Sequence, residues 1–396
     1  MDQEAFVPLS NCPDCGTPLD SVEDLLQFVV DLPEVRAYVL RIITQRGWCR
    51  CCRKTVRSTH PRQTSRAGGR ANISLGPRAL GLAADLKHRM GMPYRDIADL
   101  FTTYFGLRLT HGAIIQGCVR LSERAKPAYR ALAQRVRQSP VVHTDDTGWR
   151  IRLESAWLWV FATRWFTLYT VAFSRGSEVV LAILGDFQGR LVSDGLPALN
   201  TLHKQHGFLR AQCLGHPLRR AAELEAEQTR GAVRFPRAVK KLLQDAIVLS
   251  HRHGELAPST MYRYARRLEC RTDRLLASHI THEENRKLRN HLLAHREQLF
   301  PCLYEPNVPP TNNLAEQQLR GAVVTRKIGG CNRTAAHAES HAIIASIAQT
   351  AHRNGMRFTD FVTDWMASRG PPSRQPAFRR LLLRTRDSTG PPTTLR

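Results

Sequence analysis

Residues 141–172, VVHTDDTGWRIRLESAWLWVFATRWFTLYTVA, decide the fold class of this chain. Short runs of β-branched and aromatic residues favour strands, and three are expected here, in VVHTD, AWLWVFAT and FTLYTVAF. A helix is predicted next, in SRGSEVVLAILGDF, followed by strands at residues 190–194 and 208–213. Three tryptophans fall inside the strand pattern and are expected in the core or on a strand face rather than stacked on bases: Trp149, Trp157 and Trp159. The pattern predicts an α/β domain over residues 139–369.

Helical sequence lies on both sides of these strands. Residues 75–138 predict a helical region in which helices 95–105 and 110–121 flank a stop at Gly106, as in a helix-turn-helix. An ordinary helical hairpin fits the same spacing, so both interpretations stay open. Residues 217–300 predict a helical insertion within the α/β domain.

Two further segments lack hydrophobic periodicity. Residues 57–74 are rich in Gly, Arg and Ser and predict a basic linker. Residues 370–396 are rich in Pro, Arg and Thr and predict a basic disordered tail. No apolar run is long enough for a membrane span, and the acidic first residues argue against a secretory signal. We therefore expect a cytoplasmic protein.

The charge of the chain is strongly positive and uneven. Its 396 residues include 58 Lys and Arg against 34 Asp and Glu, a net charge of +24, which predicts a polyanionic partner such as DNA. Residues 1–35 hold eight acids and no base, whereas residues 36–74 hold ten bases and no acid. Residues 139–200 are nearly neutral, with five bases and six acids. The length favours an enzyme or a multi-domain binder over a small packing protein.

The cysteines near the start of the chain predict a zinc-binding module over residues 1–56. Two Cys-x2-Cys pairs can supply four thiolates to one structural Zn²⁺, namely Cys12 with Cys15 and Cys49 with Cys52. The 33 residues between the pairs exceed the usual spacing, so the insert is expected to carry its own helices. Scattered thiols without metal are the alternative.

Three carboxylates stand at positions typical of a catalytic metal site. Asp145 follows the strand VVHT, Asp194 ends the strand RLVS, and Glu316 lies near the start of a helix. Mg²⁺ or Mn²⁺ prefers such oxygen ligands, and two ions can activate a water or a 3′-hydroxyl against a phosphodiester. Taken singly, each acid is also common in turns and on helix surfaces.

The same region resembles a known family. The motifs are HTDDTGWR, AWLWVF, LVSDG, QCLGHPLRR and PTNNLAEQQLRGAVVTRKIGGCNRT, and together they resemble transposases of the insertion-sequence-66 family. The resemblance implies an RNase H-like core in which Asp145, Asp194 and Glu316 form a DDE triad. It also implies the helical insertion between the second and third acids.

The resemblance extends to residues around the triad. Cys213 and His216 match a Cys/His pair that such cores carry, with a structural or metal-binding role. The family's basic stretch matches five residues that we expect to contact DNA: Arg320, Arg326, Lys327, Asn332 and Arg333. The chain departs from the family in having Asp146, where Glu is usual. We prefer Asp145 as the ligand, because alternation along a strand sends neighbouring side chains to opposite faces.

The expected function is that of a bacterial DNA transposase associated with the nucleoid. It would cleave double-stranded DNA at the terminal inverted repeats of its element and transfer the strand into target DNA. A homo-oligomer and small accessory proteins of the same element are the expected partners, with no membrane involved. Two alternatives remain open: an inactive copy that acts as a sequence-specific DNA-binding regulator, and a metal-dependent nuclease of the same fold.

Overall fold

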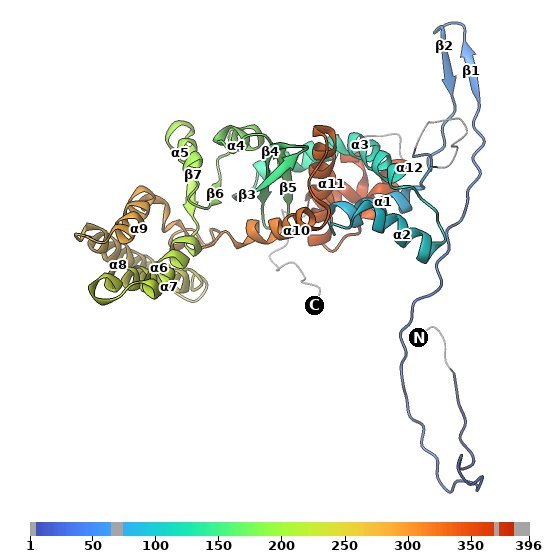
Figure 1. The fold of residues 1–396 in the computed structure, drawn as a ribbon, viewed down its shortest axis with the longest axis horizontal. Helices are drawn as coiled ribbons and strands as arrows, with labels where there is room; N and C mark the ends of the chain where they lie inside the picture. Colours follow the sequence, from blue (N-terminus) through green and yellow to red (C-terminus); the bar gives the residue numbers. More distant parts are fainter. Residues whose placement is uncertain (1–4, 65–73, 368–371, 384–396) are drawn as a thin grey trace.

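A computed structural model describes residues 5–64, 74–367 and 372–383. Three parts follow one another along the molecule in Figure 1: a unit of helices α6 to α9, a central sheet with its covering helices, and an extended N-terminal arm.

The central sheet is mixed and five-stranded. Its strands are β3 (Val141–Ile151), β4 (Glu154–Ala162), β5 (Thr167–Ala172), β6 (Arg190–Ser193) and β7 (Leu209–Gln212). Their order is β5-β4-β3-β6-β7, with β3, β4 and β5 antiparallel to one another and β3, β6 and β7 parallel. All five lie where the sequence predicts strands. Strand β3 is longer than expected, because its pairing with β4 continues through Asp145 to Ile151.

Alternation along β4 gives the sheet two buried faces. Trp159 and Phe161 contribute to the main core, while Leu158 and Val160 contribute to a smaller core on the other face. The main core contains residues of α1 (Pro77–His88), α2 (Tyr94–Phe105), α3 (His111–Arg137), α4 (Ser177–Leu184), α11 (Ala335–Arg353), α12 (Phe358–Ala367) and α13 (Pro376–Leu383). The smaller core holds residues of α10 (Asn313–Gly329) and α11.

The expected helical insertion forms a unit with its own core. Its helices are α6 (Gly215–Glu227), α7 (Arg234–Ser250), α8 (Pro258–Ala277) and α9 (Glu283–Ala294). Val192 and Ala211 of the sheet share that core, so the unit packs against the β6–β7 end of the sheet. A short helix, α5 (Asn200–His206), precedes β7.

The region 75–138 is not a separate module. Gly106 ends α2 in the left-handed conformation (φ 62°) and the Thr110 side chain caps α3, as the sequence predicts. However, α3 extends to Arg137, well beyond residue 121, and its buried face joins the main core together with the sheet. The helix-turn-helix therefore stays a prediction, and His111 and Gln116 in the first half of α3 are exposed.

The end of the chain corrects the expectation of a disordered tail. Residues 376–383 form α13, and Phe378 and Leu381 are fully buried. The ring of Phe378 lies 5.9 Å from that of Trp365 in α12. Apolar residues three apart on a helical turn find a partner surface there, which outweighs the polar composition around them. Residues 384–396 lie outside the described residues.

The N-terminal arm also differs from expectation. It contains the hairpin of β1 (Arg46–Cys49) and β2 (Lys54–Arg57). Residues 22–43 form no helix and run extended, with apolar side chains such as Leu25 and Val30 exposed. Short helices depend on tertiary packing, and this segment has almost no contact with the rest of the described chain. Of the linker 57–74, residues 65–73 lie outside the described residues.

In the part of the chain that the structure describes, no helix is both long and apolar enough to cross a membrane.

Candidate active site

Asp145 lies in β3, and Asp194 directly follows the neighbouring strand β6. The last pair in the β3–β6 register is His143 with Val192, and each aspartate lies two residues beyond its member of that pair. The two aspartates therefore lie at the same end of the β3–β6 pair, close enough for the charge of Asp194 to raise the pKa of Asp145. Asp145 thus lies within β3, at the point where pairing with β6 stops.

Asn312, directly before α10, fixes the start of the helix that carries Glu316. Its buried amide accepts from His143 Nδ1 (3.1 Å) and donates to the Thr144 carbonyl (2.9 Å). Its backbone N–H donates to the Cys213 sulfur (3.2 Å). These bonds tie the first turn of α10 to β3 and to the end of β7, beside the two aspartates. The sequence analysis did not single out Asn312, because its partners are distant in sequence.

The negative charges of the site act on one another. Burial and then the charges of Asp194, Asp146 and Glu316 raise the pKa of Asp145 to about 7, against a hydrogen bond from the Asp146 amide. Such repulsion between oxygen ligands is relieved by a bound cation, so the donor set fits Mg²⁺ or Mn²⁺.

Asp146 has a separate partner. Its carboxylate, 4% exposed, forms an ion pair with Arg175 (2.8 Å), a residue that the sequence analysis missed. The pair occupies the Asp146 side chain, which agrees with the choice of Asp145 as the ligand.

Cys213, His216 and Glu316 come together beside the aspartates. Their ligand atoms all lie within 4.8 Å of one another, and the described residues contain no other group of three or more His, Cys, Asp and Glu side chains this close. The pKa of His216 is raised by the neighbouring Cys213 sulfur and by the charges of Glu316 and Asp194, and burial opposes the rise. No close group of ligand atoms among the described residues contains Asp145 or Asp194, so the three acids lie farther apart than the atoms of this cluster.

A basic cavity of about 600 Å³ lies at the other end of β3 and α10. No acid is among the residues that line it. Trp157 is one of the lining residues, and four others are arginines: Arg150, Arg152, Arg326 and Arg333. Along α10, Arg326 is ten residues from Glu316, or about 15 Å at 1.5 Å per residue. Trp157 lies in β4 and is partly buried there, in agreement with the expected position in the core or on a strand face.

The five residues expected to contact DNA divide into two kinds. Arg320, Lys327 and Arg333 are exposed. Arg326 donates to the Gly148 carbonyl and to Thr147 Oγ1, so it also braces β3.

Asn332 is engaged within the protein through its side chain, and its contact with DNA stays a prediction. It accepts from Trp149 Nε1 (2.8 Å), and its backbone bridges to β3 at Ile151. Because α10 extends to Gly329, Arg326 and Lys327 belong to a helix rather than to a loop.

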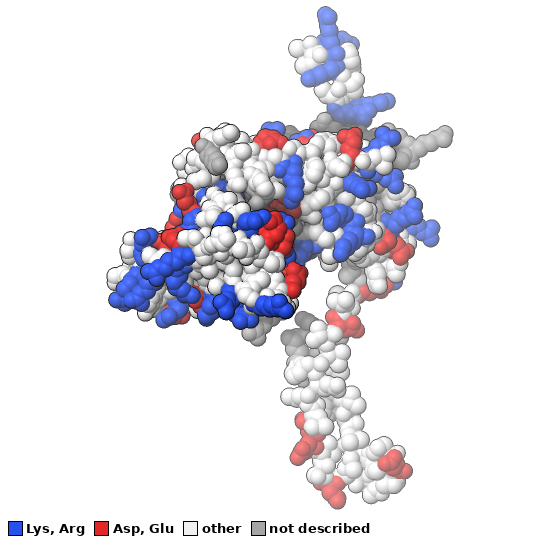
Figure 2. Space-filling view, turned by 60° about the vertical axis from the view of Figure 1, so that its left-hand side comes forward, with Lys and Arg blue, Asp and Glu red and all other residues white. Residues whose placement is uncertain are grey.

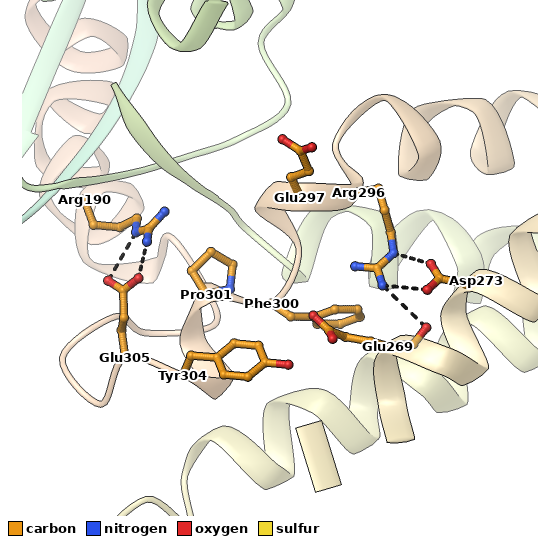
Figure 3. A pocket seen from close by; sticks show the side chains of 9 residues that line it. All are labelled: Arg190, Glu269, Asp273, Arg296, Glu297, Phe300, Pro301, Tyr304 and Glu305. Carbon is orange, nitrogen blue, oxygen red and sulfur yellow. Dashed lines mark hydrogen bonds and ion pairs between the residues drawn. The ribbon is translucent and has the colours of Figure 1, made fainter. Parts of the chain in front are cut away.

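A second cavity, of about 510 Å³, lies between the helical unit and the edge of the sheet (Figure 3). Its arginines are used internally: Arg190 pairs with Glu305, and Arg296 pairs with Asp273. These pairs link β6 and α8 to the segment that leads into α10. We interpret this cavity as part of the packing of the unit.

The cysteine pairs of the arm are not assembled into one site. Within each pair the local geometry suits a metal: the Cys52 amide donates to the Cys49 sulfur (3.4 Å), and Gly16 relaxes the first turn with φ 75°. Both effects are typical of Cys-x2-Cys zinc ligands. Yet among the described residues no close group of ligands includes these cysteines. The zinc site stays a prediction that requires the arm to fold back.

A mixed sheet that aligns two aspartates beside a helical glutamate, with covering helices, fits a DDE transposase domain. The sequence agrees: residues 72–340 match the family model described as Transposase IS66 family, and the chain belongs to that family. This confirms the resemblance noted from the motifs. The chain is also similar to the protein named "Uncharacterized protein y4jD" of Sinorhizobium fredii (strain NBRC 101917 / NGR234). The two are 23% identical over 376 residues, which cover 87% of this chain and 72% of that protein.

Proposed function

We propose that this protein cleaves the inverted-repeat ends of its element and joins the freed 3′ end to target DNA. The observation that carries the proposal is that Asp145 in β3 and Asp194 directly after β6 lie close together, with Glu316 also near enough to raise the pKa of Asp145. The strand order supports an RNase H-like core with these acids as its DDE triad.

Each acid has a defined task in this proposal. Asp145 and Asp194 supply oxygen ligands from the sheet. Glu316 supplies a further carboxylate from α10, the start of which Asn312 holds in position. When bound, two Mg²⁺ ions supply an activated water or 3′-hydroxyl and stabilise the leaving oxygen of the phosphodiester. The protein contributes position and charge, which account for most of phosphoryl-transfer catalysis.

The distribution of basic residues supports a path for DNA. Arg326 of the basic cavity lies about 15 Å along α10 from Glu316, a length of about four nucleotides along one strand of B-DNA. Figure 2 shows further basic side chains over the helical unit and at the β1–β2 hairpin, whereas acids line the preceding part of the arm. A duplex held at the cavity would therefore place a scissile phosphate at the carboxylates.

The remaining partners belong to the same proposal. Structural Zn²⁺ would hold Cys12, Cys15, Cys49 and Cys52 when the arm folds back. The two ends of an element must be brought together in one complex, which favours a homo-oligomer. Small accessory proteins encoded by the same element are the remaining proposed partners.

One assay tests the proposed function. The full-length protein is incubated with Mg²⁺, a labelled duplex of the element's end and a target plasmid. We expect a joined product that Asp194→Asn abolishes. Asp186→Asn is the matched control, since Asp186 is an exposed acid eight residues away and should leave joining intact.

The same assay separates the alternatives. Cleavage without joining would indicate a nuclease, and specific binding without cleavage would indicate a DNA-binding regulator. Either result contradicts the proposal.

A further inference from the structure

Cys213, His216 and Glu316 come from three different elements. Cys213 follows β7, His216 lies in the first turn of α6, and Glu316 lies in the first turn of α10. The distance between His216 Nδ1 and Glu316 Oε1 is 4.0 Å. The fold therefore brings a thiol, an imidazole and a carboxylate to one point.

The chemistry of these donors differs from that of the acid triad. Mg²⁺ binds through oxygen and does not select a sulfur ligand, whereas Zn²⁺ accepts sulfur, nitrogen and oxygen together. In a tetrahedral zinc site with bonds of 2.0–2.3 Å, neighbouring ligand atoms lie about 3.4–3.6 Å apart. The present separations, all within 4.8 Å, exceed this by at most about 1.4 Å, which side-chain rotations can close.

The surroundings favour metal binding by two of the ligands. Cys213 is 1% exposed, and its sulfur accepts the Asn312 N–H, so a polar contact already holds the sulfur in place beside His216. Nδ1 of His216 is buried and makes no hydrogen bond of normal geometry. A nitrogen that faces a carboxylate and a sulfur without a regular partner is suited to coordinate a metal.

We propose that Cys213, His216 and Glu316 form a site for a transition metal, with Zn²⁺ the best fit, distinct from the Mg²⁺ site. Three protein ligands leave the fourth position of the ion open. Glu316 belongs to both sites, so an ion here draws its carboxylate toward β7 and away from Asp145 and Asp194. Only this consequence for catalysis rests on the proposed function; the metal site itself does not.

The site can be tested by Co²⁺ absorption spectroscopy on the full-length chain. The five cysteines of the arm are first replaced by Ser, to remove other thiolate ligands: Cys12, Cys15, Cys49, Cys51 and Cys52. We expect one Co²⁺ per chain with a thiolate-to-cobalt charge-transfer band, which Cys213→Ser abolishes. Glu316→Gln should weaken Co²⁺ binding at least about tenfold. Asp194→Asn, the matched loss of a neighbouring carboxylate, should change it less than about threefold.

A missing band, a band that survives Cys213→Ser, or equal effects of Glu316→Gln and Asp194→Asn would overturn the proposal. Cys302→Ala, which removes a buried thiol outside the group, should keep the band and serves as a control for folding. The measurement uses no DNA and no Mg²⁺. A chain that binds Co²⁺ here but fails to join DNA would contradict only the proposed function, and the reverse result only the metal site.

Discussion

Single residues set the positions of the three acids. Asp145 is held in β3 by pairing with β4, and Asp194 directly follows β6, where its carboxylate accepts the Leu196 N–H (3.1 Å). Glu316 is different, since a helix can slide or rotate against a sheet. Asn312 prevents this through hydrogen bonds to His143, Thr144 and Cys213, which belong to two different strands or their ends.

Replacement of Asn312 should therefore lower both the stability of the fold and the rate of DNA cleavage. Asn312→Ala removes two side-chain hydrogen bonds and leaves a buried carbonyl unpaired, which should lower the free energy of unfolding by about 2–4 kcal/mol. Misplacement of Glu316 by about 1 Å should slow DNA cleavage on the order of 100-fold. Chemical denaturation and single-turnover cleavage measure the two effects. Asn313→Ala, the exposed neighbour, should change neither, and equal effects of the two variants would contradict the role of Asn312.

An arginine of the basic cavity is expected to contact a DNA phosphate. Arg333 is exposed at the rim, so Arg333→Ala should weaken binding of any duplex. The slope of log K against log salt should fall by about one, because one fewer counterion is released. Fluorescence anisotropy at several salt concentrations measures this slope. Arg380→Ala, an exposed arginine of α13, is the control, and an unchanged slope for Arg333→Ala would exclude a phosphate contact.

At the scale of elements, a pair of buried histidines joins α1 to α11. His88 and His341 are in hydrogen-bonding distance through their Nδ1 atoms (3.1 Å), and Trp149 of β3 stacks on His341. Burial lowers the pKa of His341 to about 4 and that of His88 well below its usual value. Both rings are therefore neutral in the folded protein at neutral pH.

This pair predicts a loss of stability in weak acid. Between pH 6.5 and 4 the unfolded chain takes up protons at these histidines that the folded chain does not, so the free energy of unfolding decreases as the pH falls through this window. For His341 alone the loss is on the order of 3 kcal/mol. Denaturant midpoints across this range measure it. His341→Asn should flatten the pH dependence, whereas the exposed control His279→Asn should not; the same pH dependence in both variants would contradict the argument.

Elements with a local pattern could be predicted from the sequence, and those stabilised by distant contacts could not. The strands β4 and β5 show their β-branched and aromatic runs directly. The extension of β3 past Asp145 was missed, because Asp-Asp-Thr-Gly favours a turn locally and only pairing with β4 overrides it. The three acids could be predicted from motifs, but Asn312 and Arg175 could not, since each acts on a residue 29 or more positions away.

At the scale of the whole molecule, the arm and the folded body have separate energetics. The residues that build the three cores begin at Leu75, so the arm buries almost nothing against them. Few contacts join the two, such as the Ala37 N–H to the Phe105 carbonyl (3.0 Å).

Removal of the arm should accordingly leave the body intact. Deletion of residues 1–62, or removal of metal from the full chain with a chelator, should shift the melting temperature of the main transition by less than about 3 °C, roughly 1 kcal/mol or less for a protein of this size. Differential scanning calorimetry tests both. A large decrease after deletion would mean that the arm stabilises the body through contacts absent from this structure.

The helical unit leaves and rejoins the catalytic core at nearly one point. The Leu214 amide donates to the Pro310 carbonyl (2.9 Å), so the two ends of the inserted segment are adjacent. Evolution can lengthen, shorten or exchange such a segment without changing the distances in space between the three acids. A designer could do the same with a short loop in place of residues 217–308, provided that Val192 and Ala211, which the unit now covers, are made polar.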